Sequence, residues 1–127
     1  MDKYLLVAVG GATGAMARYA LGGQALRWFG SGWPYGTFAA NLIGRLCMGL
    51  LAGVLALKGG ADQERWRLLL GVGVLGGFTT FSAFSLETAL MIERKAWANA
   101  FAYATASVVL SIGALFLGLI LARKVFA

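Results

Sequence analysis

The sequence contains no histidine, one cysteine, one proline and only five acidic residues. Without histidine, the chain has no imidazole to act as a general base or to ligate a metal ion. The single cysteine, Cys47, cannot form a disulfide within the chain. It lies in an apolar run, where we expect a small buried hydrophobic residue. No nucleophile, base and metal can be assembled into one site, so the sequence does not predict an enzyme.

Charge is also scarce, and most of it is positive. Of the 127 residues, 11 are Lys or Arg and 5 are Asp or Glu, which gives a net charge of +6. A basic chain of this size could bind nucleic acid, but no basic face or base-reading motif is present. The basic residues instead gather near the ends of apolar stretches, as membrane topology alone requires. We therefore expect a lipid bilayer, and no nucleic acid, as the partner.

The sequence is rich in long apolar runs, with 60% hydrophobic residues and a mean hydropathy of +0.78. A membrane-spanning helix needs about 20 mainly apolar residues. Tryptophans at predicted span ends indicate an interfacial aromatic belt; they are Trp28, Trp33, Trp66 and Trp97. The sequence predicts an all-α membrane protein with a single four-helix transmembrane domain over residues 1–127, and its spans cover residues 4–21, 34–57, 68–92 and 96–122.

Four spans place both termini on the same side of the membrane. The basic residues divide about six to four between the two sides, a weak bias under the positive-inside rule. A single orientation and a dual topology, in which the chain inserts both ways, both remain open. Two small-xxx-small pairs, Gly10 with Gly14 and Gly49 with Gly53, predict close helix contacts. From these contacts we expect oligomerisation, with a two-fold axis in the membrane plane if the protomers are antiparallel.

The segment "GGFTTFSAFS", residues 76–85, interrupts the third span with glycine and hydroxyl residues. Two glycines and the β-branched pair Thr79 and Thr80 weaken a helix. A break at bilayer depth leaves carbonyl groups that favour a cation and N–H groups that favour an anion. The alternative is a continuous helix whose hydroxyls bond to the preceding turn.

Two phenylalanines follow the proposed break at helical spacing. Phe81 and Phe84 lie three residues apart and share a face, with Ser82 and Ser85 beside them. The edge of an aromatic ring carries partial positive charge, so ring edges can stabilise a small anion without holding it tightly. Ordinary packing between helices is the alternative.

Polar residues recur at a spacing of four in two other spans. In the fourth span these are Tyr103, Ser107 and Ser111, whose hydroxyls can replace the hydration of an anion or bond to neighbouring helices. In the second span they are Thr37, Asn41 and Arg45. Arg45 stands near mid-span, where an unpaired cation costs at least about 2.5 kcal/mol. It can serve a function, reach an interface with its long side chain, or impair the protein.

Two further charged residues lie inside spans. Arg18, near the end of the first span, can reach the interface or give a vestibule a positive field. Glu87 is the only acidic residue inside a span, and a basic partner is one expectation for it.

These residues, in this order, resemble the Fluc/CrcB fluoride channel family over nearly the whole chain. The first span reads "GGATGAMARY", the second begins "GTFAANLIG" and the third contains "GGFTTFSAFSLE". The last is the most specific of the three, since it is close to the family's Gly-Gly-x-Thr-Thr-Phe-Ser-Thr-Phe-Ser-x-Glu.

The resemblance implies an antiparallel, dual-topology homodimer with two pores and a broken third helix. It also implies a structural sodium ion on the dimer axis, held by backbone carbonyls from both subunits. By motif position these carbonyls belong to Gly76 and Thr79. The implied role is passive export of cytoplasmic fluoride across the bacterial inner membrane by a multi-pass channel.

The resemblance also implies roles for individual residues. The fluoride pore comprises Asn41, Phe81, Phe84, Thr80, Ser82, Tyr103, Ser107 and Ser111. The vestibule or dimer interface comprises Arg18, Thr37, Arg45 and Glu87.

The sequence departs from the family pattern at two positions. Ala83 stands where the family usually has Thr or Ser, and Arg45 stands where a small residue is usual. We hypothesise that Arg45 reaches a pore vestibule or the dimer interface and alters conduction or anion affinity.

Two other classes fit a short four-span protein. A small multidrug exporter needs a membrane-embedded carboxylate in its first helix, and residues 4–21 contain no Asp or Glu. A membrane assembly subunit without transport activity would show no anion selectivity and no functional cost from Phe81→Ile or Asn41→Asp.

Overall fold

Four helical stretches in the computed structural model are long and apolar enough to cross a membrane, which confirms the predicted all-α, multi-pass membrane protein. The structure describes residues 2–58 and 60–126. The first, second and fourth stretches are single helices, whereas the third is built from several consecutive segments. In chain order the elements are α1 (Asp2–Phe29), α2 (Tyr35–Lys58), α3 (Gln63–Trp66), the π-helix η1 (Arg67–Leu75), α4 (Gly76–Phe78), α5 (Ser82–Glu93) and α6 (Trp97–Phe126).

The first helix is longer than the sequence predicted, because residues 22–29 are helical rather than part of a loop. Gly22, inside this helix, is a place of close approach: a Cβ added at Gly36 would lie 2.8 Å from the Cα of Gly22. Gly30 ends the helix, since its φ of +80° is the left-handed conformation that glycine adopts without strain. Its N–H donates to the carbonyl of Leu26 at 2.9 Å.

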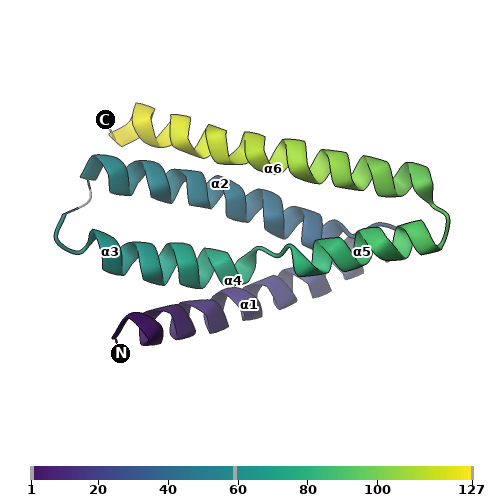
Figure 1. Cartoon of the computed structure of the whole chain (residues 1–127), viewed down its shortest axis with the longest axis horizontal. Coiled ribbons are helices and arrows are strands. Elements are labelled where there is room, and N and C mark those ends of the chain that lie inside the picture. Colours follow the sequence, from purple (N-terminus) through teal and green to yellow (C-terminus); the bar gives the residue numbers. More distant parts are fainter. Residues whose placement is uncertain (1, 59, 127) are drawn as a thin grey trace.

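The spans alternate in direction, so that both termini and the α2–α3 connection lie at one end of the bundle (Figure 1). The α1–α2 and α5–α6 connections lie at the opposite end. The third span changes partner along its length. Its first half, η1 and α4, packs mainly against α1, whereas α5 packs against α6. The change of partner coincides with residues 79–81, which lie between α4 and α5 and are not helical.

Glycines bring the helix backbones into direct contact, as the small-xxx-small pairs predicted. A Cβ added at Gly14 would overlap the carbonyl oxygen of Val74 in η1. One added at Gly49 would overlap the carbonyl oxygen of Leu115 in α6. Both glycine pairs are therefore occupied by helices of the same chain, and they give no support to the oligomerisation that we expected from them.

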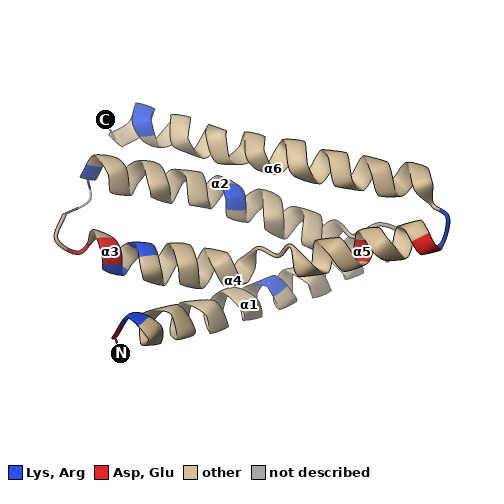
Figure 2. Ribbon diagram, viewed as in Figure 1, with Lys and Arg blue, Asp and Glu red and all other residues tan. Residues whose placement is uncertain are grey.

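The surface of the bundle is apolar along its length and charged at its ends. Large hydrophobic side chains such as Tyr19, Phe101 and Val125 are mostly exposed, as lipid contact requires. Basic and acidic residues lie mainly in the connections and near the termini, with basic residues also inside α1 and α2 (Figure 2). At the end with the termini, Lys3 pairs with Glu64 at 3.2 Å, which links α1 to α3.

Candidate functional site

Residues 79–81 form a short non-helical stretch in the middle of the third span. Thr79 adopts an extended conformation, with φ −88° and ψ 157°, directly after α4. Its N–H makes the last helical bond to the carbonyl of Leu75, at 3.0 Å, and its hydroxyl donates to the same carbonyl at 2.9 Å. The backbone groups that follow need partners from elsewhere, because water is absent at this depth.

Asn41 on α2 supplies partners for both backbone groups of Thr80. Its side-chain amide donates to the carbonyl of Thr80 at 3.0 Å, and its side-chain oxygen accepts from the N–H of Thr80 at 2.8 Å. Asn41 is buried, with 6% of its surface exposed. The asparagine that we assigned to the pore therefore acts on the backbone of the third span, and only the second N–H of its amide is left for another ligand.

The hydroxyl of Thr80 starts the next helix. It accepts from the N–H of Ala83 at 3.1 Å, in the manner of a helix cap, and lies 3.1 Å from the hydroxyl oxygen of Ser82. The cap uses the backbone of residue 83 and not its side chain. The missing hydroxyl at Ala83 therefore leaves this turn intact.

Three carbonyl groups near this non-helical stretch differ in their partners. The carbonyl of Gly77 accepts from Nε of Arg18 at 3.4 Å, so this arginine points from α1 toward the third span. The carbonyls of Gly76 and Thr79 accept no hydrogen bond from the described residues, because the N–H groups of Thr80 and Ala83 that would reach them in a helix bond elsewhere. Two free carbonyl oxygens therefore lie within the same short stretch.

Glu87 on α5 accepts hydrogen bonds from two hydroxyls. Thr37 on α2 donates to one carboxylate oxygen at 3.1 Å, and Tyr103 on α6 donates to the other at 3.2 Å. The sequence suggested a basic partner for Glu87 at an interface, and within the described chain two hydroxyls bond to its carboxylate instead. These hydrogen bonds connect the second, third and fourth spans.

A chain of aromatic contacts extends from residues 79–81 to the end of the bundle. The ring centroids of Phe81 and Phe84 are 5.6 Å apart, and those of Phe84 and Tyr103 are 5.2 Å apart. Trp33 meets Tyr103 edge to face at 5.1 Å and Phe38 at 5.0 Å. Phe84 is partly buried in this cluster, whereas Phe81 is 72% exposed.

The polar row on α6 faces the interior of the bundle. Tyr103, Ser107 and Ser111 are all buried, with 0%, 6% and 9% of their surfaces exposed. Tyr103 bonds to Glu87, but the hydroxyl of Ser107 has no hydrogen-bond partner among the described residues. A buried polar atom without a partner is costly, so it is a place to look for a ligand.

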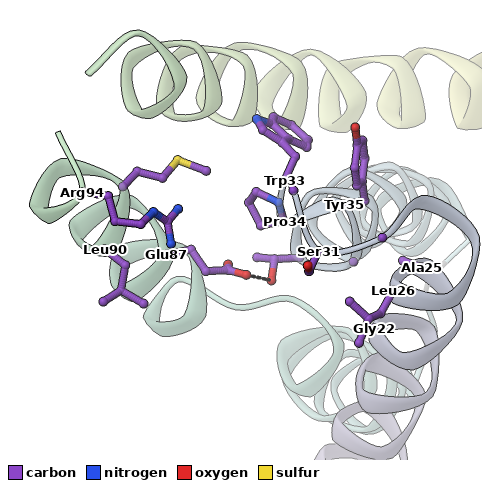
Figure 3. A pocket seen from close by; sticks show the side chains of 15 residues that line it. Gly22, Ala25, Leu26, Ser31, Trp33, Pro34, Tyr35, Glu87, Leu90 and Arg94 are labelled. Atoms are coloured by element: carbon purple, nitrogen blue, oxygen red, sulfur yellow. Dashed lines mark hydrogen bonds between the residues drawn. The ribbon is translucent and has the colours of Figure 1, made fainter. Parts of the chain in front are cut away.

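A pocket of about 300 Å³ opens at the end of the bundle that contains the α1–α2 connection (Figure 3). Glu87 points into it from α5, beside the hydrogen bond to Thr37. Arg94 lines the same pocket from the end of α5, and Trp33 lines it from the connection. The pocket extends from the bundle end to the carboxylate that accepts from Tyr103.

Arg45 differs from the other predicted site residues. It lies well inside α2 and is partly exposed. No hydrogen bond or ion pair is found for it among residues 2–58 and 60–126.

The fold and these buried groups define a multi-span membrane protein with a few polar residues in its interior. A family model described as "CrcB-like protein, Camphor Resistance (CrcB)" matches residues 5–119. A protein of Phenylobacterium zucineum named "Fluoride-specific ion channel FluC" is 70% identical over 127 residues, covering 100% of both chains. Proteins of the same name from Caulobacter sp. strain K31 and Hyphomonas neptunium are 69% and 56% identical, covering 100% of this chain and 99% and 100% of the relatives. The chain belongs to the CrcB family, whose named relatives are ion channels and not enzymes.

One contributor to the site escaped the sequence analysis. Trp33 was assigned to the membrane interface, but it packs on Tyr103 and lines the pocket. The sequence offered one clue to this role: Trp33 directly precedes Pro34, and α2 begins at the next residue, Tyr35.

Proposed function

We propose that this chain is a fluoride-selective channel that lets cytoplasmic fluoride leave the cell passively across the inner membrane. The observation that carries the proposal is the identity of up to 70% over the full chain with relatives named as fluoride-specific ion channels. The buried row of hydroxyls on α6 supports it, because such groups can replace the hydration of an anion inside the membrane.

The residues of the chain suggest how the anion is handled. The pocket beside Glu87 and Arg94 admits the ion from the aqueous side. Hydroxyl donors then follow along α6 at Ser107 and Ser111, beyond Tyr103, whose O–H bonds to Glu87. The exposed ring of Phe81 offers a weakly positive edge near the break. The hydroxyl and ring-edge contacts are each weaker than a full charge, so each can release the ion it accepts.

We also propose that two copies associate as an antiparallel homodimer with two pores. The exposed Phe81 and the exposed backbone at Gly76 lie at the centre of the third span, where a two-fold axis in the membrane plane would bring two copies together. The third span then acts as a broken helix. Its non-helical stretch is stabilised by Asn41, so it does not depend on the partner for its hydrogen bonds.

The residues present fit the structural sodium ion that the family resemblance implies. Na⁺ is a hard cation that prefers oxygen ligands, and the carbonyls of Gly76 and Thr79 are the two that lack hydrogen-bond donors in the described chain. Two copies related by the axis would together offer four such oxygens. The bound cation would offset part of the cost of placing an anion nearby in a medium of low dielectric.

Fluoride efflux from liposomes tests the channel proposal. Purified protein is reconstituted into vesicles loaded with potassium fluoride, and efflux is started with a potassium ionophore and followed with a fluoride electrode. We expect rapid fluoride release and no measurable release from matched chloride vesicles. Absence of fluoride release, or equal release of both anions, would refute the proposal and leave a membrane assembly subunit as the better reading.

A further inference from the structure

The contact between α2 and α6 is the most extensive between any two elements of the described chain, and the two helices run in the same direction. Gly49 lies against the backbone of Leu115, and Gly53 lies against Ala122. Residue numbers therefore rise together along the two facing surfaces. Moving one helical turn back on each helix leads from Gly49 to Arg45 and from Leu115 to Ser111.

This register places Arg45 and Ser111 at the same level of the membrane. On the adjoining side of α2, Asn41 and Gly44 face the third span, since Asn41 bonds to Thr80 and Gly44 meets Thr79. Arg45 is thus located between the side of α2 that faces the third span and the side that faces α6. Ser107 lies one further turn back on α6.

Two groups in this region lack the partners that their chemistry requires. The hydroxyl of Ser107 is buried without a hydrogen bond in the described structure. The guanidinium of Arg45 has no carboxylate or other acceptor there, although an intramembrane cation is costly when it is unpaired. One small anion would satisfy both groups, because it accepts from O–H and N–H donors and neutralises the charge.

We infer that Arg45, Ser107 and Ser111 form an anion-holding site between α2 and α6, at which fluoride dwells on its way through the protein. The inference rests on the proposed channel function and deepens it, since it names the place where fluoride is bound most tightly during its passage. A full positive charge holds an anion more strongly than hydroxyls or ring edges do. The channel should therefore saturate at low fluoride concentration and release each ion slowly.

Calorimetric titration of the detergent-purified protein with sodium fluoride tests the site directly. Arg45→Gln, which removes the charge but keeps a shorter polar side chain, should weaken fluoride binding by roughly 10-fold to 100-fold, the loss expected for one charge-assisted hydrogen bond. Arg45→Lys, which keeps the charge, should weaken it less. Arg123→Gln is the matched control, because Arg123 is exposed in the last turn of α6. Equal affinity in the wild type and Arg45→Gln, or equal losses in Arg45→Gln and Arg123→Gln, would overturn the inference.

Ser107→Ala gives a second test, in which two readouts change in opposite directions. Removal of a buried hydroxyl without a partner should raise the melting temperature in fluoride-free buffer. The same substitution should reduce the additional stabilisation that saturating fluoride gives, because that stabilisation follows from binding. An unchanged response to fluoride in Ser107→Ala would contradict the site, whatever the effect on the ligand-free protein.

The dependence of efflux on concentration separates the two proposals. In liposomes, Arg45→Gln should raise the half-saturating fluoride concentration by roughly tenfold and increase the maximal rate. If the wild type conducts fluoride and Arg45→Gln has the same half-saturating concentration, the anion-holding site fails and the channel proposal stands. If the wild type conducts no fluoride, the channel proposal itself fails.

Discussion

Asn41 and Thr80 form a two-point hydrogen bond between the second and third spans, at 3.0 and 2.8 Å. The side-chain amide of Asn41 takes the place of a neighbouring peptide group, so the stretch between α4 and α5 remains bonded without a helix. Through these hydrogen bonds, Asn41 on α2 fixes the backbone of the third span, and with it the positions of the nearby carbonyl groups and phenylalanine rings. Substitution at position 41 should therefore affect both stability and conduction.

Asn41→Ala should lower the free energy of unfolding by about 2–4 kcal/mol, because it leaves both backbone groups of Thr80 without partners. Asn41→Asp should be damaging as well, since it puts a carboxylate oxygen where the amide donates to the carbonyl of Thr80. Thermal unfolding in detergent measures the effect. Asn99→Ala is the control, because Asn99 is exposed on α6. Equal melting temperatures for Asn41→Ala and Asn99→Ala would contradict this role.

The number and order of the spans could be predicted from the sequence, because a span needs a long apolar run and tryptophans are common at the membrane interface. The ends of the helices were harder to predict. Residues 22–29 lie outside the predicted first span but are helical, because a glycine that contacts another helix, as Gly22 contacts Gly36, and a glycine in a turn look the same in a sequence. The π-helix from Arg67 to Leu75 also has no signal that distinguishes it from an α-helix of equal hydropathy.

The individual residues of the candidate site could be proposed from the sequence, but the hydrogen bonds between them could not. Spacing along one helix showed that Tyr103, Ser107 and Ser111 share a face, and burial of all three confirms it. The partners of Glu87 lie on two other spans, at separations that no local pattern encodes. A sequence can reveal a polar side chain in a membrane more readily than the group that satisfies it.

The hydrogen bonds of Glu87 predict that substitutions at Glu87 and at either of its two partners have non-additive effects on stability. Tyr103→Phe removes the hydroxyl that donates to Glu87 at 3.2 Å and should lower stability by about 1 kcal/mol. Thr37→Val should have a similar effect through the other carboxylate oxygen. When either substitution is combined with Glu87→Ala, its effect should nearly vanish, because the acceptor is already gone. A double-mutant cycle on unfolding free energies measures this, and full additivity would exclude the coupling.

The contact of α1 with the third span predicts a contrast between two neighbouring glycines. A Cβ at Gly14 would overlap the carbonyl oxygen of Val74, so Gly14→Ala should destabilise the protein by about 1–3 kcal/mol. A Cβ at Gly11 would meet no atom within 4 Å, so Gly11→Ala should be neutral or stabilising by up to about 1 kcal/mol. Melting temperatures of the two variants test the contrast. If both substitutions had the same effect, α1 could not lie as close to η1 as it does.

The turn between α5 and α6 contains a residue in a strained conformation. Lys95 has a φ of 61°, and Ala96 donates to the carbonyl of Met91 at 2.9 Å across the turn. Lys95→Gly should raise the free energy of unfolding by about 1 kcal/mol, because glycine adopts this conformation without a clash. Lys95→Ala removes the charge but retains the strain, and it should leave stability nearly unchanged. A gain of the same size in Lys95→Ala would trace the effect to charge rather than to backbone strain.

Substitutions of Phe81 and Phe84 should separate effects on stability from effects on conduction. Phe84 packs against Tyr103 and the buried cluster around Met91, so Phe84→Ile should lower stability by about 1–2 kcal/mol and reduce conduction. Phe81 is 72% exposed and touches little besides Phe84, so Phe81→Ile should change the melting temperature of the protomer only slightly. It should nevertheless reduce fluoride efflux from liposomes by roughly tenfold or more, because isoleucine has no ring edge to stabilise the anion. Leu86→Ile, at another exposed position of α5, controls for β-branching on that helix. Normal efflux in Phe81→Ile would remove Phe81 from the fluoride path and leave its exposure to be explained by contact with lipid.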